Sequence, residues 1–132
     1  MSETLEIGHG YQSANTTVTT TTETLAIGTD QIASPRQTVS ALVFALLQLT
    51  TGTGTTGVTL RIRRGVLPTD PTVGEANVVT IGAAAGGTEV FSLLAREELQ
   101  DAASVRYTAW VTQAAATGNG TILQAAILAL LV

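Results

Sequence analysis

The chain has 132 residues and no cysteine, so it has room for one domain, without disulfides or thiolate metal ligands. Its net charge is −4, and arginine is its only cationic residue type apart from one histidine. This balance argues against a general nucleic-acid or anionic-membrane surface. Only 12% of the residues are charged and 45% are hydrophobic, which indicates that much of the surface is buried against partners.

Residues 1–15 are polar apart from a short alternating patch, and we expect them to form an N-terminal arm ahead of a single β-sandwich domain, residues 16–132. Leu5, Ile7 and Tyr11 are the expected anchors of this arm on a neighbouring subunit. A fold-back onto the same subunit is the alternative. The sequence has no signal-peptide pattern and no apolar run long enough to span a membrane, so we expect synthesis in a cytoplasm.

Residues 16–27 are rich in threonine and predict an extended strand, and residues 38–49 are the central apolar segment that follows. Read at a period of two, both faces of this segment are mostly apolar, which is typical of a strand covered on both sides. A helix is the alternative, because Ser34 and Pro35 resemble a helix start and leucines recur at helical spacing. The β-branched residues and glycine turns around the segment favour the strand.

Further strands are expected at residues 58–64, 78–81, 88–94, 105–113 and 121–132. Residues 65–77 predict a long loop stiffened by prolines, and residues 95–103 a short helix, from their helix-forming composition. About seven to eight antiparallel strands at this spacing predict an all-β jelly roll or β-sandwich.

The segments 38–49 and 121–132 are apolar on both faces. If they lie side by side, their sheet has a hydrophobic outer surface, which is most simply buried about a three-fold axis. The residues expected at the core and subunit contact are Leu42, Phe44, Leu46, Leu128, Leu130 and Val132.

The sequence offers little for catalysis. His9 is the only histidine and sits in the polar arm, so we expect no Ser-His-Asp site, and a two-histidine metal site is short of ligands within one chain. A ring of His9 copies around a symmetry axis is the remaining arrangement for a metal. Glu97, Glu98 and Asp101 are expected on a solvated corner rather than in an active site. We therefore expect no enzymatic activity, no cofactor and no resident metal.

Arg61, Arg63 and Arg64 carry half of the positive charge. One reading is a contact with an acidic surface of a partner, since arginine binds carboxylates through two parallel hydrogen bonds. The other is a solvated face on which they pair with Glu23, Glu75 or Glu89.

Three stretches carry a resemblance: VTLRIRRG after a glycine-threonine turn, SVRYTAWV, and the closing TILQAAILALLV. They resemble the small jelly-roll decoration (cement) and head-fibre proteins of tailed bacteriophages, which are related in shape to trimeric TNF and C1q domains. The resemblance covers residues 23–132. It implies a homotrimer bound in the virion to the major capsid protein or another virion protein, without nucleic acid or membrane as a partner.

Two alternatives share this fold: a tail, neck or fibre component, and a knob that binds glycans on a receptor. A glycan-binding knob needs exposed aromatic side chains for stacking on sugars. The residues available for that are Tyr11, Tyr107 and Trp110.

Overall fold

The computed structural model describes residues 6–19, 22–33, 38–79, 88–100 and 104–132, and the regular structure in these residues is β-strand. The strands are β1 (Glu6–Gln12), β2 (Thr16–Val18), β3 (Thr24–Gly28), β4 (Ile32–Ala33), β5 (Thr38–Thr50), β6 (Gly57–Arg64), β7 (Thr72–Val79), β8 (Thr88–Gln100), β9 (Ser104–Val105), β10 (Tyr107–Ala114) and β11 (Gly120–Leu131).

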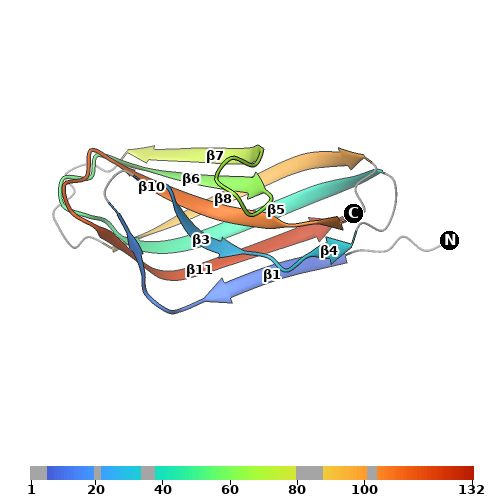
Figure 1. Ribbon diagram of the computed structural model, residues 1–132, viewed down its shortest axis with the longest axis horizontal. Helices are drawn as coiled ribbons and strands as arrows, with labels where there is room; N and C mark the ends of the chain where they lie inside the picture. The colour runs from blue at the N-terminus through green and yellow to red at the C-terminus, as the bar shows by residue number, and fades with distance from the viewer. Residues whose placement is uncertain (1–5, 20–21, 34–37, 80–87, 101–103) are drawn as a thin grey trace.

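The longer strands form two antiparallel sheets of four strands each. Sheet A has the order β1-β11-β5-β8, with the short β2 also paired to β11, and sheet B has the order β3-β10-β6-β7. A separate short pair joins β4 and β9. Figure 1 shows the two sheets as stacked layers whose strands run along the long axis of the molecule. The prediction of an antiparallel sandwich with seven to eight main strands is confirmed.

Strand β5 shows why the central apolar segment is extended. Its alternate residues from Val39 to Leu49 are at most 2% exposed and face sheet B. Within sheet A, β5 lies between β11 and β8, and its Phe44 is directly opposite Leu128 of β11. The strand reading of residues 38–49 is therefore correct, and the two doubly apolar segments do lie side by side.

The core fills the space between the sheets. Sheet B contributes Leu60, Ile62 and Tyr107, all at most 2% exposed, opposite the inner side chains of β5 and β11. The Tyr107 hydroxyl donates to Glu97 Oε2 at 2.8 Å, and Arg64 Nη1 binds Glu97 Oε1 at 2.7 Å. This polar group joins the two sheets near the ends of β6 and β8.

Two of the predicted elements were wrong. The helix expected at residues 95–103 is, up to Gln100, the second half of strand β8, because Ala95 and Leu99 face the core at a period of two; Asp101 lies outside the described residues. The loop expected at residues 65–77 ends earlier, since β7 begins at Thr72 and pairs with β6. The segment 16–27 also departs from one continuous strand, because β2 and β3 pair with different sheets.

The expected N-terminal arm is corrected over most of its length, because β1 is the edge strand of sheet A and pairs with β11 of the same chain. Glycines allow this close approach. A Cβ on Gly10 would meet the carbonyl oxygen of Gly28, and one on Gly8 would meet Ile32. Leu5 lies outside the described residues, whereas Ile7 and Tyr11 are exposed on β1.

Tyr107 gives the fold a testable dependence on alkaline pH. The pKa of Tyr107 is raised far above its usual value, mainly by burial and next by the hydrogen bond to Glu97. The folded chain therefore keeps a proton that the unfolded chain loses above about pH 10, so stability decreases as the pH rises beyond that value. We expect a loss of about 1 kcal/mol in urea unfolding between pH 10 and 11, with the slope approaching about 1.4 kcal/mol per pH unit at higher pH.

The Tyr107→Phe variant is the control for this prediction. It should be less stable by about 1–2 kcal/mol at pH 8, because Glu97 loses a donor. Its stability should then decrease less steeply above pH 10 than that of the wild type. Equal slopes for the two proteins would contradict the assignment.

Candidate interaction surface

The outer side of sheet A carries large apolar side chains that the chain itself does not cover. We call this surface the apolar face. It consists of Ile7, Tyr11, Leu42, Phe44, Leu46, Val90, Leu94, Leu128, Leu130 and Val132. Leu94 and Val90 are 66% and 64% exposed, and Phe44 is 41% exposed. Single exposed apolar residues are ordinary, but a contiguous set on one sheet marks an interaction site.

Strand register arranges this face in rows across the sheet. The central row runs from His9 on β1 through Leu128 and Phe44 to Leu94 on β8. The row on one side contains Ile7, Leu130, Leu42 and Arg96, and the row on the other contains Tyr11, Ala126, Leu46 and Ser92. Residues directly opposite each other on neighbouring strands point to the same side, so these rows form one continuous surface.

Polar residues close the face at both ends. Gln48 and Gln124 are opposite each other at one end, next to Val90. At the other end, Arg96 and Glu98 approach to 3.7 Å. An apolar centre with a polar rim is the usual composition of a protein–protein interface.

A shallow hollow of about 180 Å³ lies at the glutamine end of the apolar face. Its lining residues are Tyr11, Leu46, Gln48, Val90, Gln124, Ala125 and Ala126. This is room for a side chain from another molecule.

All six residues expected at the core and subunit contact are brought together on this one surface. Leu42, Phe44 and Leu46 belong to β5, and Leu128 and Leu130 belong to β11. Val132 directly follows β11 and pairs with Ser40 of β5. They belong to the outer face rather than to the core. The sequence analysis missed Leu94 and Val90, although the period of two in residues 88–94 places both on the same side.

The arginines on sheet B are held by carboxylates of the same chain. Glu23 accepts from Arg61 at 2.8 Å and from Arg63 at 2.9 Å, and Glu75 binds Arg61 at 3.0 Å. The Arg61 hydrogen bonds hold the pKa of Glu75 below its usual value. Together with the Arg64–Glu97 pair, these contacts match the reading in which the arginines pair with Glu23 and Glu75.

The aromatic residues that a glycan-binding knob needs are mostly inside. Tyr107 is fully buried and Trp110 is 7% exposed, so Tyr11 alone of the three is open to solvent. Trp110 lies opposite Arg61 on the outer side of sheet B. Glu23, which directly precedes β3, binds both Arg61 and Arg63 on β6, the strand on the far side of β10 from β3.

In the part of the chain that the structure describes, His9, Glu97 and Glu98 lie in different surroundings. His9 lies in the central row of the apolar face, and its backbone N–H donates to Asp30 Oδ1 at 3.2 Å. Glu97 is engaged by Arg64 and Tyr107, and Glu98 is exposed near Arg96. Within the described ranges, no group of three or more His, Asp or Glu side chains is placed to hold a metal ion.

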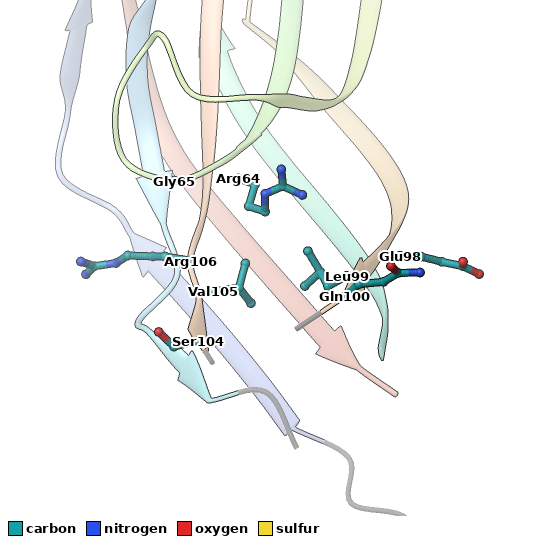
Figure 2. Close-up of a pocket in the computed structure, with 8 residues that line it drawn as sticks. All are labelled: Arg64, Gly65, Glu98, Leu99, Gln100, Ser104, Val105 and Arg106. Atoms are coloured by element: carbon teal, nitrogen blue, oxygen red, sulfur yellow. The ribbon is translucent and has the colours of Figure 1, made fainter. Parts of the chain in front are cut away.

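A larger cleft of about 400 Å³ lies where β6 and β8 end and where β9 leads into β10 (Figure 2). Arg106 and Glu98 extend outward on opposite sides of it, with Arg64, Leu99 and Val105 between them. Arg64 is paired with Glu97, and Arg106 donates to the carbonyl of Thr29 at 2.9 Å. Arg64 is already paired within the chain and Arg106 points away from the cleft, so the cleft adds no site.

No helix in the part of the chain that the structure describes is long and apolar enough to cross a membrane.

No protein-family model and no curated protein sequence matches this chain. Among solved structures, the chain is similar to the Eiger TNF from S. frugiperda, with a TM-score of 0.60 and 12% identity over 97% of this chain and 91% of that one. It is also similar to VP2 in the subviral particle of infectious bursal disease virus, with a TM-score of 0.55 and 10% identity. That match covers 97% of this chain but only 32% of VP2. At these identities the likeness establishes the fold alone, an antiparallel β jelly roll.

Proposed function

We propose that this chain is a non-enzymatic structural protein of a virion, a homotrimer that decorates an assembled phage head and stabilises its shell. The observation that carries the proposal is the apolar face of sheet A. Burial of this face against further copies of the chain accounts for its size and for the low charge of the sequence.

The energetics favour association through this face. Covering a large apolar side chain contributes about 1.5–3 kcal/mol, and the face presents several in adjacent rows. Association and side-chain ordering offset part of that gain. The outer side of sheet B, with its Arg61, Arg63 and Glu23 network, would lose solvated charge without a comparable apolar gain. The resemblance to decoration proteins sets the expected number of copies at three.

The role on a particle is supported by fold and by resemblance. The VP2 protein, which shares the fold, is part of a subviral particle. In this proposal Ile7 and Tyr11 belong to the subunit contact, and the trimer binds the major capsid protein or another virion protein. Many copies on one shell would add their small individual contributions through avidity.

Light scattering at pH 8 over a range of protein concentrations tests the trimer. We expect a mass of three times 13.5 kDa. A stable mass of one or two chains would overturn the trimer.

Co-sedimentation with heads isolated from the virus that encodes the chain tests the decoration role separately. Bound trimers should raise the temperature at which the heads release their contents. A trimer that does not bind heads would overturn the decoration role, while the proposed trimer would still stand.

A further inference from the structure

The only histidine of the chain lies on the surface that we assign to subunit contact. On β1, His9 is directly opposite Leu128, and the same row continues through Phe44 to Leu94. The exposed Ile7 and Tyr11 flank it along the strand. Its imidazole is exposed in the single chain and would be covered, among apolar neighbours, when copies associate.

Few charges are placed to compensate a protonated imidazole at this position. The outward side chains that β11 and β5 contribute to the three rows around His9 are uncharged: Ala126, Leu128, Leu130, Leu42, Phe44 and Leu46.

The charged groups nearest to this surface lie at its margins. On β8, Arg96 and Glu98 form the rim pair. The carboxylate of Asp30 binds the backbone N–H of His9 at the sheet edge, and Glu6 on β1 is opposite the buried Leu131, on the other side of the sheet. A second copy of the chain presents the same set of groups.

We propose that His9 makes the homotrimer dissociate in acid, an inference that rests on the proposed function. A charge inside an apolar contact is costly, so the assembled chain takes up fewer protons than the separated chain. Histidine ordinarily gains its proton between pH 8 and 5. As the pH falls through that range, protons bind preferentially to the separated chains, and association weakens.

The size of the effect follows from the stoichiometry. Three chains each exclude up to one proton, so the association constant should fall by up to about 1,000-fold for each pH unit once imidazole is mostly protonated. A device of this kind would release the protein from its particle in an acidified compartment and restore it on neutralisation.

Light scattering on the full chain at pH 8, 7, 6 and 5, at constant ionic strength and protein concentration, tests the inference. Far-UV circular dichroism at each pH confirms that the sandwich stays folded. We expect a trimer at pH 8, dissociation by pH 5, and recovery of the trimer on return to pH 8. In His9→Gln, which is uncharged throughout, the mass should not change with pH.

Three further variants separate His9 from other titrating groups. His9→Arg, which is charged at every pH, should be dissociated even at pH 8. Asp30→Asn removes the carboxylate that binds the His9 backbone, Glu98→Gln removes the rim carboxylate beside Arg96, and both should keep the wild-type response. A trimer that persists at pH 5, or an equal acid response in His9→Gln, would overturn the inference while the proposed trimer stands. A monomer at pH 8 would overturn both.

Discussion

Replacing Phe44 by glutamate is expected to give a folded monomer. Phe44 is at the centre of the apolar face and is already 41% exposed in the single chain, so its replacement leaves the core unchanged. In the trimer, the new carboxylate would be buried directly between Leu128 and Leu94, neither of which can pair with it. Loss of the apolar contact plus burial of an unpaired charge should weaken association by at least about 1,000-fold, or about 4 kcal/mol.

Light scattering gives the mass of this variant, and thermal unfolding shows whether the monomer is folded. Leu67→Glu is the matched control, because Leu67 is 55% exposed in the connection between β6 and β7, away from the apolar face. It should remain a trimer. A Phe44→Glu protein that keeps the wild-type mass would show that the apolar face is not the subunit contact.

The sequence was most informative where one side-chain type filled both faces of a strand. Segments 38–49 and 121–132 could each be recognised because burial on both sides leaves no polar alternation. Their adjacency was only a condition of the predicted apolar surface, and the pairing of β11 with β5 meets it. The register of β5 on β11, which places Phe44 opposite Leu128, could not be read from either segment alone, because every shift by two residues offers similar apolar pairs.

In the second half of strand β8, the local composition led to the wrong prediction of a helix. The stretch after Leu94 is made of good helix formers, and its period of two is hidden because a charged residue, Glu97, faces inward. That orientation depends on Arg64 and Tyr107, which are distant in the sequence and bind the Glu97 carboxylate. Tertiary contacts of this kind override intrinsic propensity.

The candidate surface was predicted in part. Its leucines and Phe44 followed from the pattern, but the role of β1 did not, because Gly8 and Gly10 in a polar segment are also typical of a flexible arm. Only the structure shows that these glycines allow β1 to approach Gly28 and Ile32. The place of His9 on the apolar face is a consequence of that pairing.

At the end of the sandwich opposite Glu6 and Val132, the connection between β5 and β6 binds the connection between β10 and β11. The Gly52 N–H donates to the buried Gln113 Oε1 at 2.6 Å, and the Thr117 N–H donates to the carbonyl of Thr53 at 2.8 Å. Gln113 belongs to β10 in sheet B, whereas Gly52 follows β5 in sheet A. This contact therefore fixes the sheets to each other and sets the ends of β5 and β11, the strands that form the middle of the apolar face.

Gly52→Ala should destabilise the fold strongly, because the new Cβ would overlap the carbonyl oxygen of Gly118. That obstacle is backbone, which cannot turn away as a side chain does, so the two connections must separate and lose the hydrogen bond to Gln113. We expect a loss of about 3 kcal/mol and a melting temperature lower by roughly 10 °C, measured by urea and thermal unfolding. Gly118→Ala is the control: its Cβ would lie 3.3–3.5 Å from Thr53 atoms, and a change below about 1 kcal/mol is expected. If both variants were equally stable, the close approach of the two backbones at Gly52 would not be a determinant of the fold.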